Sequence, residues 1–268
     1  MDLGFSSLGD PSLSFEASCK LAYEYGLAFV ELRVMEGSLD LPGYFAERPF
    51  PSRPLRPIRV LGSSLRLIGS QKSEVDEFLR FAKLATALGV PYVRAFGGGE
   101  WGKTPTEREI HSAQAVAENC REQIALHHLD CELLLETHGS FSDSEACLRL
   151  NQRLAEPLAI LWDSHHTWRV AGESPDETWV RLGTQVRHIH YKDSVSDIQN
   201  REGCRYVLPG LGEYPTEALI QLLQNADYQG GVSLEWEKLW HSDLPPLHVA
   251  LKAFCNLLPS RLMSTSGN

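Results

Sequence analysis

The feature that most constrains the fold of this chain is a repeated alternation of short apolar runs and amphipathic segments. Each apolar run has about the length of a buried β-strand, and most are followed by apolar side chains at helical spacing. Such alternation favours a parallel sheet, because parallel strands need a crossover connection, usually a helix. The predicted strands cover residues 3–8, 28–33, 58–61, 91–96, 132–135, 158–162, 186–190 and 231–235.

The number of strands and the chain length predict a closed barrel. Eight strand–helix repeats in 268 residues match a single (β/α)8 TIM barrel, which typically takes about 250 residues. No G-x-G-x-x-G follows the first strand, which argues against an open dinucleotide-binding sheet. We therefore predict an α/β protein with one barrel domain over residues 1–268, of which 258–268 form a frayed tail.

The connections between strands are predicted as helices, with a few exceptions. Residues 36–56 are rich in proline and glycine and are expected to form a loop with little helix that partly covers the active-site end. Residues 63–68 are expected to be irregular, 97–99 to be a flexible loop, and 191–214 to be a long loop. The predicted helices cover residues 15–25, 73–88, 106–128, 142–154, 175–182, 215–225 and 245–257.

Charge and cysteine content narrow the function classes. The chain has 35 acidic and 25 basic residues, and a net charge of -10 repels nucleic-acid backbones. No apolar run approaches the ~20 residues of a membrane span, and no signal-peptide pattern opens the chain. The six cysteines are scattered without a C-x-x-C pair, as expected for reduced thiols. We expect a cytoplasmic protein that binds neither nucleic acid nor membrane.

Four predicted strands end in side chains that bind metal ions: Glu136, Asp163, His190 and Glu235. In a parallel barrel these strand ends form the active-site face. Three carboxylates brought together there would repel one another, and a divalent cation between them removes that repulsion. Oxygen ligands with one imidazole suit Mn2+, Mg2+, Co2+ or Fe2+ better than structural Zn2+, with Zn2+ as a further option. The alternative is that each residue is a separate helix cap or strand-end ion pair.

The same strand ends carry motifs by which the chain resembles the xylose-isomerase-like sugar phosphate isomerase/epimerase superfamily over essentially its whole length. The matching stretches are residues 29–33 (FVELR), 135–138 (LETH), 162–166 (WDSHH), 188–193 (HIHYKD), 210–212 (GLG) and 232–237 (VSLEWE). Members of that superfamily have a (β/α)8 barrel and usually bind one divalent metal through Glu, Asp, His and Glu. By motif position the resemblance maps these ligands to Glu136, Asp163, His190 and Glu235, because H-x-K-D selects His190 over His188.

The resemblance also implies a reaction. In sugar isomerases and epimerases of this kind, one metal-bound glutamate removes a proton next to a carbonyl, and the other returns it. It therefore implies that Glu136 and Glu235 are acid/base groups of an enzyme of carbohydrate metabolism that acts on a sugar, keto-sugar or cyclitol through an enediolate. The implied alternative is a dehydratase of the inosose or 3-dehydroshikimate type. Related barrels are often dimers or tetramers, so a homo-oligomer is expected as an option.

Two further readings stay open. One is a DNA hydrolase like the apurinic endonucleases that share this barrel, because the chain has additional histidines near the strand ends. Its acidic charge and lack of basic loops count against that reading. The other is a non-catalytic barrel that binds a ligand or partner, for which the absence of metal from purified protein would be the discriminating observation.

Four residues near the strand ends are predicted to contact substrate: Arg94, His138, His166 and Lys192. His166 is the histidine of the D-x-x-H motif, and is expected to bind a substrate oxygen or serve as an extra ligand. His138 follows Glu136 by two residues and so faces the same way, although a loop histidine outside the pocket is equally expected. Lys192 is expected to neutralise a substrate charge, with Asp193 as its ion-pair partner.

Two other polar residues lie on the same strands. His188 is predicted one layer deeper than His190, because strand alternation puts both on one face. Glu31, near the end of the second strand, is expected to form a structural ion pair rather than to reach the pocket.

Overall fold

The centre of the molecule is a closed barrel of eight parallel strands in the order β1-β10-β7-β6-β5-β4-β3-β2, which confirms the predicted (β/α)8 fold. The computed structural model describes residues 1–48, 50, 55–200 and 203–258, so the predicted tail lies outside the described residues from 259 on. The strands are β1 (Asp2–Ser6), β2 (Phe29–Leu32), β3 (Ile58–Ile68), β4 (Tyr92–Gly98), β5 (Glu132–Glu136), β6 (Ala159–Asp163), β7 (Val186–Tyr191) and β10 (Gly231–Leu234).

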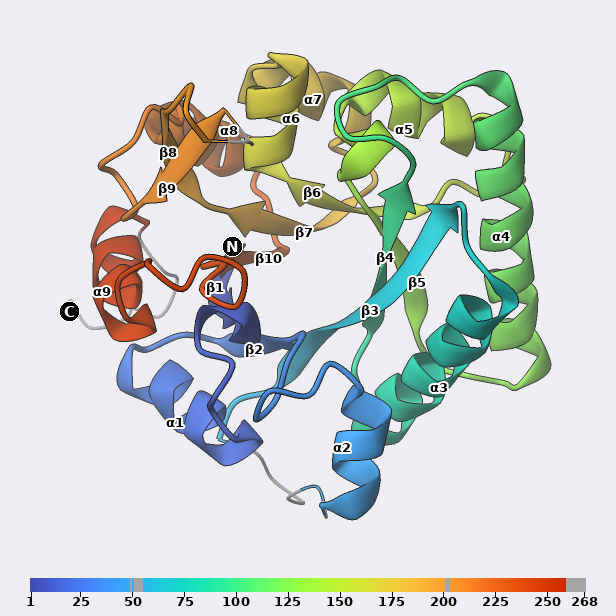
Figure 1. Cartoon of the computed structure of the whole chain (residues 1–268), viewed down its shortest axis with the longest axis horizontal. Helices are drawn as coiled ribbons and strands as arrows, with labels where there is room; N and C mark the ends of the chain where they lie inside the picture. The colour runs from blue at the N-terminus through green and yellow to red at the C-terminus, as the bar shows by residue number, and fades with distance from the viewer. Residues whose placement is uncertain (49, 51–54, 201–202, 259–268) are drawn as a thin grey trace.

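Helices form a ring around these strands (Figure 1). Several begin and end where short sequence signals predict. Thr106 and Glu109 form a capping box at the start of α4, and Gly89 ends α3 in the left-handed conformation. The helices are α1 (Phe15–Glu24), α2 (Leu41–Glu47), α3 (Lys72–Leu88), α4 (Glu107–Leu126), α5 (Ser144–Asn151), α6 (Ser164–Ala171), α7 (Pro175–Leu182), α8 (Thr216–Asn225) and α9 (Leu247–Leu257). In the described ranges, no helix is both long and apolar enough to cross a membrane.

The barrel interior is apolar at one end and polar at the other. A small cluster of buried apolar side chains, separate from the main core, is formed by Val60, Leu134, Ala159 and Leu161. Because side chains alternate along a strand, residues two positions further along face the same side. Glu136 therefore lies above Leu134, and Asp163 lies above Leu161. The apolar layer inside the barrel is thus followed directly by a layer of charged side chains at the carboxyl-terminal ends of the strands.

The connection at residues 36–56 contains one short helix, α2, in agreement with the expected loop with little helix. Asp40 caps α2 by accepting a hydrogen bond from the Gly43 backbone N–H at 3.2 Å, and Pro42 occupies the first turn. The helix contacts α3, where Arg80 pairs with Asp40 at 2.9 Å. No described residue of 36–56 lines the large cavity at the barrel mouth, so the expectation that this segment covers the site is not supported.

Four other connections also differ from the predictions. Strand β3 continues through residues 63–68, with a register shift between Gly62 and Arg66, and β4 includes Gly97 and Gly98. The long connection 191–214 contains an antiparallel hairpin of β8 (Asp193–Ser196) and β9 (Cys204–Val207). Helix α6 starts directly after Asp163, whose side chain accepts a hydrogen bond from the His166 N–H. Asp163 is thus a helix cap, the alternative role that the sequence left open, and it also belongs to the group of possible metal ligands.

The close packing of Gly98 at the end of β4 predicts that a side chain there would lower the free energy of unfolding. Gly98 has φ +79°, and a Cβ there would lie 2.4 Å from the Ile68 carbonyl oxygen, whereas Gly172 has φ +71° with open space around it. Both Gly→Ala changes incur left-handed backbone strain of roughly 1–2 kcal/mol. We expect Gly98→Ala to lower the free energy of unfolding by a further 1–3 kcal/mol or so, because backbone must move. Urea unfolding of both variants measures this, and equal losses would contradict the clash.

Candidate metal centre and active site

Four predicted ligand side chains converge at the carboxyl-terminal end of the barrel. One ligand atom each of Glu136, Asp163, His190 and Glu235 lies within 4.8 Å of the other three, and all four residues are buried. The strand register explains this convergence. Asp163 pairs with His190 across β6 and β7, and His190 pairs with Ser233 across β7 and β10. Glu235, two residues beyond Ser233, faces the same side, and these four side chains are called the ligand quartet below.

The atoms at the centre of the ligand quartet have charged neighbours, but several of them form no hydrogen bond within the protein. His190 Nδ1 lies 3.2 Å from Glu235 Oε1, 3.7 Å from Glu136 Oε1 and 4.0 Å from Asp163 Oδ2. His190 Nδ1, Glu136 Oε2 and Asp163 Oδ2 are buried without a hydrogen-bond partner, although Arg94 and Lys192 lie within ion-pair distance of the two carboxylate oxygens. Buried polar atoms without partners are rare and costly. Carboxylate oxygens with one imidazole nitrogen are a donor set that divalent cations bind, so these residues fit a divalent metal ion.

The protonation preferences of the carboxylates agree with this fit. Burial raises the pKa of Asp163 to about 8, although the nearby charge of Lys192 opposes the shift. Burial would also raise the pKa of Glu235, but the charges of His190 and Lys192 outweigh it and hold that pKa well below its ordinary value. Burial would also raise the pKa of Glu136, but the charge of Arg94 and the nearby His190 together outweigh it and lower that pKa. A cation between the three would favour the charged form of each, Asp163 included.

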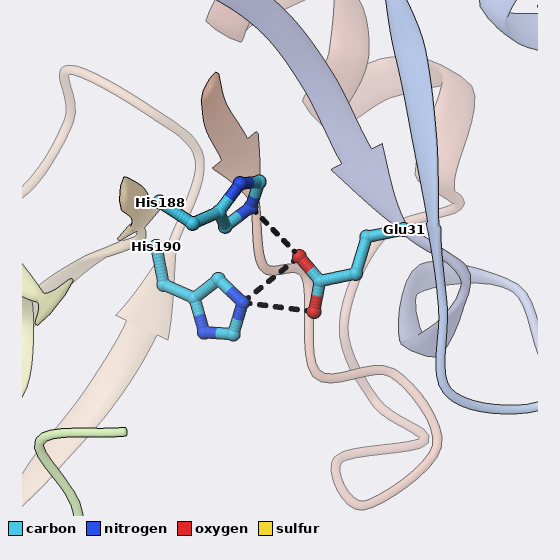
Figure 2. Close-up of side chains that lie close together, drawn as sticks. All are labelled: Glu31, His188 and His190. Carbon is cyan, nitrogen blue, oxygen red and sulfur yellow. Dashed lines mark hydrogen bonds and ion pairs between the residues drawn. The ribbon is translucent and has the colours of Figure 1, made fainter. Parts of the chain in front are cut away.

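His190 is oriented by a carboxylate on its far side. Figure 2 shows Glu31 facing both His188 and His190. His190 Nε2 lies 2.9 Å from each Glu31 oxygen, and His188 Nε2 lies 3.1 Å from Glu31 Oε2 and 2.8 Å from Ser233 Oγ. A carboxylate bonded to one imidazole nitrogen fixes the ring and leaves the other nitrogen for a metal. Glu31 is thus a buried partner of His190, and His188 lies one layer deeper, as its strand position predicts.

A cavity of about 570 Å3 opens above the ligand quartet. All four residues predicted to contact substrate line it, together with both glutamates of the quartet. Several other wall residues, among them Arg33 and Glu237, are not among the residues predicted to contact substrate. The lining residues are Leu8, Arg33, Arg94, Phe96, Trp101, Glu136, His138, His166, Lys192, Tyr206, Glu235, Glu237, Trp240 and His241.

Two neutral histidines and a tryptophan form one wall of the cavity. His166 Nδ1 lies 3.0 Å from the Thr137 carbonyl oxygen and 3.2 Å from Asp163 Oδ2. Burial lowers the pKa of His138 and holds that of His166 well below its usual range, so both imidazoles are neutral. The Trp101 ring packs edge-on against both, at 4.9 Å between centroids. This wall offers an apolar face together with imidazole nitrogens for hydroxyl groups.

Lys192 pairs with the metal-binding side rather than with Asp193. Its Nζ lies 2.9 Å from Asp163 Oδ2 and 2.5 Å from Glu235 Oε2, and also pairs with Glu237. The predicted Lys192–Asp193 pair is therefore wrong.

Asp193 has a structural role. Its carboxylate accepts hydrogen bonds from the backbone N–H groups of Gly210 at 3.0 Å, Gly212 at 2.9 Å and Tyr214 at 3.1 Å. The G-x-G segment does bind an anion through its backbone, but that anion belongs to the chain itself. The role could not be predicted because these groups are far apart in the sequence.

The chain belongs to the xylose isomerase-like TIM barrel family, whose sequence profile matches residues 58–253. No curated protein sequence matches it. Among solved structures, it is similar to the probable 3-DHS dehydratase AsbF involved in petrobactin synthesis from Bacillus anthracis (TM-score 0.75, 20% identity, covering 96% of this chain and 99% of that one). It is also similar to an IOLI protein with a binding zinc atom (TM-score 0.72, 16% identity, covering 96% of this chain and 98% of that one). An L-ribulose 3-epimerase is similar as well (TM-score 0.67, 14% identity, covering 96% of this chain and 93% of that one). At these identities the likeness shows a shared fold.

The contact between Glu31 and His190 predicts an effect on metal affinity. Glu31→Gln removes the charge that orients the imidazole, and loss of such a partner typically weakens metal binding about 10–100-fold. Calorimetric titration of metal-free protein with MnCl2 measures this affinity. Glu177→Gln, at an exposed helix cap, is the matched control and should bind Mn2+ like the unmodified protein. Unchanged affinity in Glu31→Gln would show that His190 needs no such partner.

The ion pairs of Lys192 predict a large effect on stability. Lys192→Met leaves Asp163, Glu235 and Glu237 facing one another without their shared cation. Breaking a buried ion pair by removing one partner costs about 3–5 kcal/mol of unfolding free energy. Urea unfolding should show this loss, and added MnCl2 should restore part of it. The exposed pair of Lys103 with Glu100 gives the control, since Lys103→Met should change stability by less than about 0.5 kcal/mol. A small loss in Lys192→Met would contradict the buried network.

Proposed function

We propose that this member of the xylose isomerase-like TIM barrel family is a divalent-metal-dependent enzyme that isomerises or epimerises a sugar, keto-sugar or cyclitol by proton transfer. One observation carries the proposal: the ligand quartet lies beneath a cavity that its glutamates, Glu136 and Glu235, also line. The cavity volume of about 570 Å3 falls in the range of small-molecule sites. A sugar or cyclitol held there would contact both carboxylates.

Several residues at the cavity have a role in this proposal. A divalent ion bound by the quartet would stabilise negative charge that develops on substrate oxygens. Glu136 and Glu235 approach from different strands, so one can remove a proton from carbon while the other returns it. Arg94 and Lys192 keep these carboxylates ionised and able to act as bases. His138 and His166 would hydrogen-bond hydroxyl groups, and Trp101 and Trp240 would pack against the sugar face.

Dehydration is the second candidate reaction. It starts with the same proton removal and continues with loss of a hydroxyl group as water, and one similar structure is described as a probable 3-DHS dehydratase. DNA hydrolysis is disfavoured by the net charge of -10. We also propose a cytoplasmic location, because all six cysteines are free, as thiols are in a reducing compartment.

The proposal is tested by screening keto-sugars and inososes with added MnCl2 in deuterated water and following C–H exchange by NMR. Exchange at one carbon supports proton transfer, and loss of water identifies a dehydratase. Glu136→Gln and Glu235→Gln should each lower kcat about 10²–10⁴-fold, because each removes an acid/base group. Glu177→Gln should leave turnover unchanged. High residual turnover in either site variant would remove its acid/base role, and absence of both exchange and metal binding would favour a non-catalytic barrel.

A further inference from the structure

Two buried arginines lie together in the cavity wall, and the proposed proton transfer does not use one of them, Arg33. Arg33 is 5% exposed and Arg94 is 1% exposed. Both side chains pack over Gly62, where a Cβ would lie 2.8 Å from Arg33 Cδ and 2.9 Å from Arg94 Nη2. Glycine at this position leaves room for the two cationic side chains to approach the same point.

The partners of the two arginines differ in charge. Arg94 Nε lies 3.1 Å from Glu136 Oε2, and its guanidinium lies over the Phe96 ring at 3.7 Å from the centroid. Arg33 donates hydrogen bonds to neutral acceptors, the Gly62 carbonyl oxygen at 3.4 Å and Ser64 Oγ at 3.0 Å. Within the part of the chain that the structure describes, no carboxylate forms an ion pair with Arg33. Of the two adjacent cations, Arg94 has a carboxylate within ion-pair distance and Arg33 does not.

This imbalance has a physical cost. Burial, together with the neighbouring charge of Arg94, lowers the pKa of Arg33 to about 10, although the more distant charges of Glu77, Glu136 and Glu235 oppose the shift. Buried charges in proteins are normally paired, because an unpaired one loses its hydration without compensation. Arg33 borders the cavity, so a bound molecule can supply the missing negative charge.

We propose that Arg33, with Arg94, forms an anion subsite of the cavity, and that the substrate is a sugar acid or carboxylated cyclitol whose carboxylate binds there. This inference rests on the proposed function in taking the cavity as the substrate site. A carboxylate carries one negative charge and matches the single unpaired cation, whereas a phosphate monoester carries about −1.5 to −2. The planar guanidinium also binds both carboxylate oxygens at once.

Calorimetric titration of the MnCl2-supplemented protein with quinate and with myo-inositol tests the subsite. Both are hydroxylated six-membered rings, but only quinate carries a carboxylate. We expect quinate to bind at least about 10-fold more tightly, and Arg33→Met to weaken quinate binding about 10–100-fold while leaving myo-inositol binding unchanged. Arg80→Met, at an exposed arginine that pairs with Asp40, is the matched control and should retain the preference.

Several outcomes would overturn the proposal. Equal affinity for the two ligands, or a preference for quinate that persists in Arg33→Met, would show that Arg33 does not bind the carboxylate. Tighter binding of myo-inositol 1-phosphate than of quinate would overturn the carboxylate assignment. If Arg33→Met does not fold, Arg33→Lys replaces it, and should lose at least about threefold in quinate affinity because it lacks the planar fork.

The result is independent of turnover. Quinate and myo-inositol have no carbonyl next to an exchangeable C–H, so neither undergoes the proposed reaction. C–H exchange on neutral keto-sugars with no quinate preference would reject the anion subsite and leave the proposed function in place. A quinate preference that depends on Arg33, without C–H exchange on any substrate, would support the anion subsite and reject the proposed proton transfer.

Discussion

Repulsion between buried carboxylates is the constraint on which the barrel mouth depends. Four of them, Glu31, Glu136, Asp163 and Glu235, are buried close together, and the partly exposed Glu237 lies beside them. Nearby cationic and hydrogen-bonding groups reduce this repulsion. Two imidazoles face Glu31, a guanidinium faces Glu136, and the ammonium of Lys192 is shared by the other three carboxylates. What remains uncompensated lies at the centre of the ligand quartet, where a divalent cation would act on several carboxylates at once.

Much of the fold and of the quartet could be predicted from the sequence, because both follow from periodic patterns. Strand alternation and parallel register bring Glu136, Asp163 and His190 to one end of the barrel without any knowledge of distant contacts. Breaks in the pattern misled the prediction elsewhere. Gly62 suggested the end of a strand that in fact continues to Ile68 as β3, and the hairpin of β8 and β9 is too short to give a periodic signal.

The parts of the site that could not be predicted depend on pairings across the barrel. Glu31 reaches two histidines more than 150 positions away, and Asp193 caps backbone groups on a later turn. The role of Arg33 could not be predicted, because its position beside Gly62 and Arg94 and its lack of an ion pair depend on the tertiary structure. Local residue type indicates that such a group is polar, but the charge that faces it is set by tertiary structure.

Arg94 connects the two halves of the site. Its guanidinium pairs with Glu136, which is one of the quartet, and it shares the space above Gly62 with Arg33. A ligand carboxylate beside both arginines would compete with Glu136 for the positive charge of Arg94. Weaker pairing raises the proton affinity of Glu136, since Arg94, together with His190, holds its pKa down against burial. Binding of an anionic substrate would therefore make Glu136 a stronger base when a C–H bond is within its reach.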